Sequence, residues 1–441
     1  MSMSSSGSWR NPSWVTGLAL LLSSLAVLAP PARAQITPTG GEIPVNVETV
    51  GDQFNAVVAA ATDGTFAVVW TSTAQDGSFD GIYLRRFGAD GSPLGGEQLV
   101  NTETLADQSD PDLAFLSGGG FVVVWDSDLQ DGELRGIYGQ LFDSTGMKVG
   151  SEFPVNATTA GDQNDAVVAA ATGGGFLVAW ETQAAQDPFE DLVVRLFDSS
   201  GQPVSGEIAL NQTTAGDQED VDLASDAAGN FVAVWESDGQ AETGEAIVAR
   251  RLDATGTPVG NEIPVNTTTN GDQLDPDLAV RPDGSFVVAW EDLIQGPFPL
   301  TFFRTFAADG TATSGEIATD DMSNPRFLPR LGFGPNRGPV IIWISEGQDG
   351  SGAGSRVRHF DSAGNPRGLS QPVNVEVVGN QVFPHLAIHG SSGLAVWDSD
   401  GDQDGSGIGV YARRLALPVS IFADGFESGD TTEWSQVVGE T

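Results

Sequence analysis

Seven tryptophans recur along the chain at an almost constant interval, and this spacing restricts the fold more than any other feature. The intervals are 55, 55, 55, 55, 53 and 54 residues between Trp70, Trp125, Trp180, Trp235, Trp290, Trp343 and Trp397. A repeat of this length holds four short strands but is too short to bury its own hydrophobic face, which is typical of a β-propeller blade. The sequence therefore predicts an all-β, seven-bladed β-propeller with four-stranded antiparallel blades.

The fifth unit shows how one repeat divides into strands. Residues 276–280 form a short strand, Asp283 and Gly284 supply a two-residue hairpin turn, and residues 286–290 return as a nearly continuous apolar run. Such a run is expected of a strand buried on both faces between neighbouring blades. A third strand, an Asp-x-x-Gly turn and a fourth strand ending in Val-Asn complete the unit.

The two ends of the repeat array predict how the ring closes. A Val-Asn strand at residues 41–46 precedes the first tryptophan unit, and no matching strand follows the last unit. We expect the N-terminal strand to complete the seventh blade, because this pairing removes the exposed edge of an open array. The alternative is that residues 418–422 supply that strand.

The N-terminus has the pattern of a secretory signal. Arg10 precedes an apolar run at residues 15–28, and small residues follow at Ala32 and Ala34. We expect a signal peptide at residues 1–34, the propeller at 35–418 and a C-terminal tail segment at 419–441. No second run of about 20 apolar residues occurs, so we expect no membrane insertion. The expected location is extracellular or at the cell surface, with the periplasm left open.

The composition is strongly acidic. The chain has 19 Lys and Arg against 60 Asp and Glu, a net charge of −41, and removal of residues 1–34 would leave 17 − 60 = −43. Such a field repels nucleic acid and anionic membranes and attracts cations. The absence of cysteine excludes disulfides, thiol nucleophiles and zinc–thiolate sites. Divalent cations are therefore one candidate for structural links, and simple solubility is the alternative explanation of the charge.

Two polar side chains recur with the repeat, and we interpret both as structural. A glutamine in the turn before the first strand should satisfy backbone groups within the blade; it occurs at Gln53, Gln108, Gln163, Gln218, Gln273 and Gln381. An arginine in the third strand is expected to pair with blade carboxylates such as Asp112, Asp222 or Asp277; it occurs at Arg85, Arg195, Arg250, Arg304, Arg358 and Arg413.

The loops after two of the tryptophans predict metal ligands. Carboxylates at alternate positions followed by glycine let a tight loop wrap several oxygens around a hard cation such as Ca²⁺. The candidate ligands are Asp398, Asp400, Asp402 and Asp404 in the seventh unit and Asp126, Asp128 and Asp131 in the second. The alternative is a solvated acidic turn.

No catalytic signature accompanies these loops. The chain lacks a nucleophile elbow and a phosphate-binding glycine loop. Its three histidines are His359, His385 and His389, and the last two lie about 13 Å apart if they are on one strand, too far for a shared metal. We assign no catalytic and no cofactor-binding residue. The sixth unit departs from the repeat and carries Arg326, Arg330 and Arg337, which indicates either drift or an anion-binding face.

The repeat also resembles known proteins. The pattern Pro-Asp-Leu-Ala at residues 276–279, Gly284 and the apolar run at 286–290 resemble the repeats of large secreted bacterial β-propellers of undefined function. More distantly the unit is similar to the blades of sialidase-type propellers, although the Asp-box pattern S-x-D-x-G-x-T-W is not reproduced. The resemblance covers residues 40–416 and implies the fold but no activity. Residues 424–430 resemble a segment near the C-termini of many secreted bacterial proteins, which favours a recognition segment or a packed strand over an anchor.

These observations favour a monomeric, non-catalytic binding scaffold, stabilised by Ca²⁺, whose rim loops bind a polysaccharide or a cell-surface protein at several points. The alternative is a secreted carbohydrate-active hydrolase or lyase with its site in the sixth or seventh blade. An enzyme should have one singular pocket, whereas a multivalent scaffold should have similar rims all round.

Overall fold

The computed structural model describes residues 35–418, apart from 185–187, 242, 294–297, 321–322, 335–337, 349, 402 and 404. The expected signal peptide at 1–34 and the tail at 419–441 lie outside the described residues. The chain divides into two units, Met1–Arg33 and Ala34–Thr441, and the described residues all belong to the second.

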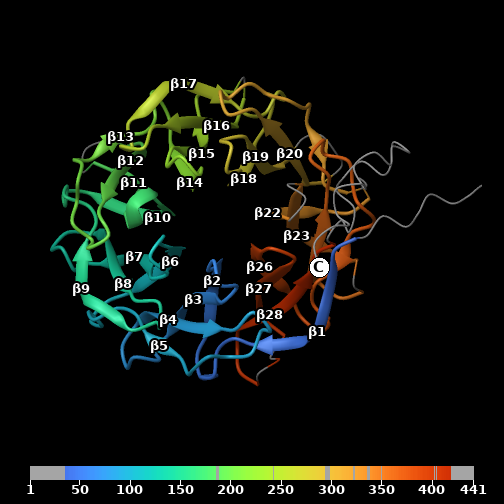
Figure 1. Ribbon diagram of the computed structural model, residues 1–441, viewed down its shortest axis with the longest axis horizontal. Helices are drawn as coiled ribbons and strands as arrows, with labels where there is room; N and C mark the ends of the chain where they lie inside the picture. Colours follow the sequence, from blue (N-terminus) through green and yellow to red (C-terminus); the bar gives the residue numbers. More distant parts are fainter. Residues whose placement is uncertain are drawn as a thin grey trace, which may run out of the picture. The chain divides into compact units, whose positions relative to one another are not determined.

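This second unit is the predicted seven-bladed β-propeller. Seven four-stranded antiparallel sheets, one for each repeat, follow one another around a central axis (Figure 1). The first strand of each blade lies nearest the axis; these inner strands are β2 (Gln53–Ala60), β6 (Gln108–Phe115), β10 (Asp162–Ala170), β14 (Gln218–Ser225), β18 (Gln273–Val280), β22 (Arg326–Phe333) and β26 (Gln381–His389).

The second strand of each blade carries the repeated tryptophan, and we number the blades one to seven in the order of these tryptophans. These strands are β3 (Phe66–Thr73), β7 (Phe121–Asp128), β11 (Phe176–Gln183), β15 (Phe231–Asp238), β19 (Phe286–Asp292), β23 (Pro339–Glu346) and β27 (Ser392–Ser399). All seven tryptophans are completely buried, and the hydrophobic clusters around them join residues of adjacent blades. The core therefore lies between the blades, so that a blade depends on its neighbours for burial.

The third and fourth strands complete each sheet. The third strands are β4 (Asp80–Phe87), β8 (Arg135–Phe142), β12 (Asp191–Phe197), β16 (Glu245–Leu252), β20 (Leu300–Phe306), β24 (Ala353–His359) and β28 (Gly409–Ala416). The outer strands are shorter or more exposed: β5 (Gln98–Leu99), β9 (Lys148–Pro154), β13 (Ile208–Ala209), β17 (Pro258–Pro264), β21 (Ile317–Ala318), β25 (Gln371–Pro372) and β1 (Thr37–Pro44). One short 3-10 helix, η1 (Thr172–Gly174), lies between β10 and β11. Among the described residues, no helix is long and apolar enough to cross a membrane.

The ring closes as predicted, through the N-terminal strand. The seventh sheet has the order β1-β28-β27-β26, and β1 pairs with β28 from Thr37 opposite Ala416 to Pro44 opposite Tyr411. Beyond the strand, Val45 N donates to Val410 O at 2.9 Å. The alternative, in which the segment after residue 418 takes this place, is wrong because β1 already occupies the position of the fourth strand.

Removal of β1 should open the ring. A chain that begins at Val47 leaves the edge of β28 unpaired and uncovers the buried side chains around Ile36 and Val45, so we expect a lower melting temperature and self-association by edge pairing. Light scattering after size-exclusion chromatography measures the second effect. The control is a chain of residues 35–418, which keeps β1; a monomeric Val47 variant with the melting temperature of this control would contradict closure by β1.

Candidate functional site

The inner strands share a β-bulge that turns one side chain toward the axis. In every blade the register of the inner strand shifts between two residues three positions apart, as between Ser109 and Asp112 in blade two. The residue directly after the first of these two adopts a left-handed conformation, with φ between 47° and 52°, at Asn55, Asp110, Asp165, Asp220, Asp275, Leu328 and Phe383. Asn and Asp tolerate this conformation better than other side chains, because they hydrogen-bond locally. The repeated acid at this position is therefore partly a consequence of backbone geometry.

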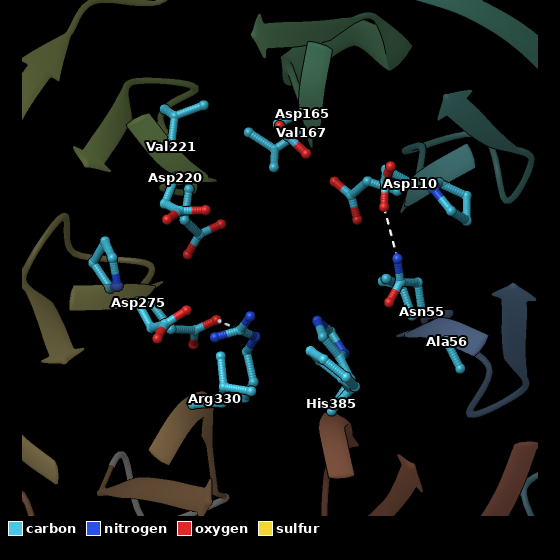
Figure 2. A pocket seen from close by; sticks show the side chains of 18 of the residues that line it. Asn55, Ala56, Asp110, Asp165, Val167, Asp220, Val221, Asp275, Arg330 and His385 are labelled. Atoms are coloured by element: carbon cyan, nitrogen blue, oxygen red, sulfur yellow. Dashed lines mark hydrogen bonds and ion pairs between the residues drawn. The ribbon is translucent and has the colours of Figure 1, made fainter. Parts of the chain in front are cut away.

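The bulge residues line a cavity of about 250 Å³ on the axis of the ring. Figure 2 shows that Asn55, Asp110, Asp165, Asp220 and Asp275 point into this space from successive blades. We name the cavity the axial channel. Its lining is asymmetric, because blades two to five contribute four aspartates, whereas blades six and seven contribute Leu328 and Phe383 at the same position.

A second layer of side chains lies two residues further along each inner strand. It consists of Val57, Asp112, Val167, Asp222, Asp277, Arg330 and His385. The three aspartates and His385 also join the blades, since each accepts a backbone N–H from the next blade. Asp112 Oδ2 accepts from Val168 at 2.7 Å, and Asp222 Oδ2 accepts from Leu278 at 2.6 Å.

Arg330 is the one guanidinium among the residues that line the channel. Its Nε lies 3.7 Å from Asp277 Oδ1, and Figure 2 shows the side chain directed into the channel beside Asp275. Burial raises the pKa of Asp112 to about 7 and that of Asp275 to about 6, and the charge of Arg330 opposes the increase at Asp275. The channel thus holds carboxyl groups that change protonation near neutral pH.

A third set of acids follows the tryptophans and supports the bulges. Five blades have a buried carboxylate directly after the tryptophan, at Asp126, Glu181, Glu236, Glu291 and Asp398. Asp126 Oδ2 accepts from the bulge amide of Asp165 at 3.0 Å, and Asp398 Oδ2 accepts from that of Asn55 at 2.8 Å. Each acid therefore caps the bulge of the next blade, which explains structurally why it recurs.

Burial makes these caps weak acids. It raises the pKa of Asp398 to about 8, of Glu181 to about 10 and of Glu291 to about 8, and it raises the pKa of Asp126 well above the ordinary range. Carboxyl groups of neighbouring blades, such as Asp165 beside both Asp126 and Glu181, add to the increase. The ring therefore concentrates negative charge that protons or cations must offset.

Two groups of three carboxylates have a geometry that could hold a metal ion. They are Asp110, Asp126 and Asp165, and Asp220, Glu236 and Asp275; within each group, one oxygen of every residue lies within 4.8 Å of the others. Each group combines one buried cap with bulge residues of two adjacent blades. Asp126, predicted as a ligand from the loop pattern, thus lies near two carboxylates that the sequence did not associate with it.

The other predicted ligands lie away from these groups. Asp128 ends β7, and Asp131 Oδ1 accepts from Glu133 N within the following loop at 3.1 Å. Asp400 is exposed and binds the amide and side chain of Asn380. Asp402 and Asp404 lie outside the described residues. Within the described part of the chain, Asp128, Asp131, Asp398 and Asp400 belong to no group of three that could hold a metal.

The repeated glutamine is structural, as predicted. All six are buried, and their side chains bind either the tryptophan of the same blade or the Val-Asn asparagine that follows the fourth strand of the preceding blade. Gln108 Oε1 accepts from Trp125 Nε1 at 3.0 Å, whereas Gln53 Oε1 accepts from Asn46 Nδ2 at 2.9 Å.

The expected partners of the repeated arginine are wrong. These arginines donate to backbone carbonyls at the end of the previous blade's fourth strand, as Arg195 does to Val155 O at 2.6 Å and Arg413 to Val373 O at 2.7 Å. Asp112, Asp222 and Asp277 face the channel instead. A backbone carbonyl at the end of a strand needs a hydrogen-bond donor, just as a buried carboxylate does. The sequence does not show which of these two acceptors lies nearer to each arginine.

The comparisons with known proteins support the fold only. No model of a protein family matches the sequence, and no curated protein matches it significantly. A structure of a protein of unknown function from Dyadobacter fermentans is similar at a TM-score of 0.52 and 10% identity, covering 88% of this chain and all of that one. The polysaccharide lyase Uly1 is similar at 0.50 and 10% identity, covering 84% and 90%. The NanB sialidase of Streptococcus pneumoniae gives 0.46 and 7% identity, covering 86% and 71%.

The first two similarities show the fold alone: the protein is a β-propeller, like a polysaccharide lyase and a protein of unknown function. At such low identity the likeness transfers no residue role.

The histidine of the channel predicts a pH dependence. His385 is enclosed by protein except on the channel side, and burial, followed by the charge of Arg330, lowers its pKa to about 3, against about 6.5 in the unfolded chain. Its contribution to stability is present above pH 6.5 and is lost as the pH falls toward 3, because only the unfolded state binds the proton. We expect His385→Gln to remove up to about 2 kcal/mol of the stability lost between pH 7 and pH 5.

Urea unfolding at several pH values measures this difference. The control is His389→Gln, which replaces an exposed histidine on the same strand and should keep the wild-type dependence. An unchanged pH dependence in His385→Gln would contradict the buried, neutral histidine.

Proposed function

We propose that the chain is a secreted, non-catalytic binding scaffold for a polysaccharide or a similar hydroxyl-rich polymer of a cell surface, and that the polymer is held at the axial channel. Secretion rests on the sequence pattern at residues 1–34. The place of binding rests on the channel, which all seven blades line and which differs from blade to blade.

The observation that carries the proposal is the chemical contrast across the channel. Phe383 of blade seven lines the channel and is 49% exposed, although it is a large apolar side chain. Asp165 and Asp220 of blades three and four lie across the channel from His385 of blade seven (Figure 2). Sugar hydroxyls donate well to carboxylates, and the apolar face of a sugar ring packs on an aromatic side chain. Arg330 adds a donor for hydroxyl or carboxylate groups of the same ligand.

The rim supplies the second part of the proposal. The loops after each second strand repeat around one face of the ring, and exposed side chains such as Phe79 and Leu129 lie on them. Weak contacts at several such loops would strengthen the binding of a repetitive polymer without a further specific pocket. A cell-surface protein is the alternative partner for this rim.

The test compares the channel with the rim. We expect Phe383→Ala to weaken binding to the polysaccharides that bind the wild-type protein on a glycan array by at least about 10-fold, because it removes the aromatic surface. Phe79→Ala removes an aromatic ring that is 60% exposed on the rim, and it should change binding less than about threefold.

The possible outcomes separate the hypotheses. A loss with Phe79→Ala and not with Phe383→Ala would place the binding on the rim, and no polysaccharide binding at all would overturn the proposal. New reducing ends or unsaturated sugar products in the incubated samples, abolished by Asp275→Asn, would favour the second candidate, a hydrolase or lyase. That candidate is supported by the pKa of Asp275 near 6 beside Arg330.

We also propose that Ca²⁺ binding to carboxylates of the chain stabilises the scaffold, as the acidic loops after Trp125 and Trp397 suggested. We expect EDTA to lower the melting temperature, and Ca²⁺ to restore it in a saturable manner that sodium chloride at matched ionic strength does not reproduce. Differential scanning fluorimetry measures the shift. Equal melting temperatures with EDTA and with Ca²⁺ would show that Ca²⁺ does not stabilise the fold.

A further inference from the structure

The two carboxylate groups in the channel differ in how their buried member is satisfied. Glu236 caps the amide of Asp275, and no oxygen of its side chain is among the buried atoms without a hydrogen-bond partner. Burial, followed by the charge of Asp220, raises the pKa of Glu236 to about 11.

Asp126 has no equivalent arrangement. Its side chain is 1% exposed, and its Oδ2 accepts from the amide of Asp165 at 3.0 Å. Its Oδ1 is buried and has no hydrogen-bond partner. A buried carboxylate oxygen without a partner is unfavourable, and where two further carboxylates lie beside it, a bound cation would satisfy it.

The two neighbouring carboxylates are oriented by amides. Asn55 Nδ2 donates to Asp110 Oδ1 at 2.7 Å, and Asn164 Nδ2 donates to Asp165 Oδ2 at 2.7 Å. In each case one oxygen is fixed by an amide, and no described hydrogen bond uses the other. The second oxygen of Asp110 and the second oxygen of Asp165 are therefore available to a cation.

The nearest cationic side chain is already engaged. Arg135 binds Asp162 through two hydrogen bonds of 2.9 and 2.8 Å, and its Nη1 lies 3.9 Å from Asp126 Oδ2. Arg135 therefore approaches the capping oxygen of Asp126, whereas the partnerless oxygen is Oδ1. The charge of the three carboxylates is only partly compensated by this side chain.

We propose that Asp110, Asp126 and Asp165 form a binding site for one divalent cation of the size of Ca²⁺ at the junction of blades two and three, open to the axial channel. The ligands would be carboxylate oxygens, which Ca²⁺ prefers. Its metal–oxygen distances of about 2.3–2.6 Å let two ligand oxygens lie up to about 5 Å apart, so a group whose oxygens lie within 4.8 Å of one another can hold it. Asp165 is exposed to the channel, so water can complete the coordination.

This inference rests on the proposed function only in taking the cation to be Ca²⁺; it differs in placing the ion in the channel and not in the loops at residues 126–131 and 398–404. The ion would join the bulges of two blades and leave the opposite wall, with Phe383 and Arg330, open to a ligand. A polymer hydroxyl or carboxylate could then coordinate the ion directly.

The chain offers a matched control for the buried ligand. Asp398 also follows a tryptophan, is 1% exposed, caps a bulge amide and has a partnerless Oδ1, but its bulge partner is Asn55 and it belongs to no group of three acids among the described residues. The substitution Asp398→Asn therefore changes an acid that caps a bulge amide but leaves the three proposed ligands unchanged.

The experiment is calorimetric titration of Ca²⁺ into the chain of residues 35–418 after treatment with EDTA. We expect binding at this site to weaken at least about 10-fold in Asp126→Asn and in Asp165→Asn, and to change less than about twofold in Asp398→Asn. The melting temperature in EDTA checks that each variant folds. If Asp126→Asn fails to fold, Asp165→Asn still tests the site, because Asp165 faces the channel.

Three results would overturn the inference. They are unchanged Ca²⁺ binding in both Asp126→Asn and Asp165→Asn, equal weakening in Asp398→Asn, and no Ca²⁺ binding by the wild-type chain. The glycan array, run in EDTA and in Ca²⁺, separates this failure from that of the proposed function: polysaccharide binding without Ca²⁺ binding leaves the scaffold intact and removes only the ion.

Discussion

The bond between the acid after the tryptophan and the bulge amide of the next blade is the interaction on which the channel depends. A bulge leaves an N–H that the strand ladder does not use, and a buried donor without an acceptor is unfavourable by about 1–3 kcal/mol. Asp126, Glu181 and Asp398 supply that acceptor from the neighbouring blade. The same contact fixes the bulge, turns its side chain to the axis and links consecutive blades. Ring closure and the lining of the channel therefore have one physical origin.

This arrangement also explains the concentration of charge at the axis. A cap must be an acceptor, and a left-handed bulge residue is best an Asn or Asp, so the fold itself places carboxylates on two adjacent layers. Arginines offset their repulsion at two places along the ring. Arg330 lies beside Asp277, and Arg135 approaches Asp126. The net charge of the whole chain adds to this local field.

The sequence predicted the fold more completely than the site, for physical reasons. The interval between tryptophans reflects packing between blades, which every repeat must satisfy, so the blade number, the strands and the closure by β1 all followed from periodicity. The structural role of Gln273 followed from the same reasoning, because a group present in nearly every blade is part of the blade.

The channel was missed because periodicity does not show which residues of different blades meet. The signal was present two residues after the turn glutamine, where Asp110, Asp165, Asp220 and Asp275 recur. The sequence predicted that the first strand starts after these positions, for example at Pro276 in the fifth unit. These aspartates were therefore assigned to the preceding turn. Asp126 was singled out for a loop pattern, whereas its burial on β7 gives it different neighbours. A pattern local to one repeat cannot show a contact across two.

Blades six and seven depart from the acidic pattern of the axis in a way that the backbone geometry does not explain. Leu328 and Phe383 adopt φ values of 47° and 49°, a conformation that is unfavourable for bulky side chains and that Asn or Asp would relieve. The bulge geometry is the same as in the other blades, so the backbone does not require these residues. Phe383 also leaves 49% of its surface exposed. A strained, exposed aromatic side chain at one end of an otherwise acidic lining stabilises neither the blade nor the ring, and strain of this kind is typical of a surface shaped for a ligand.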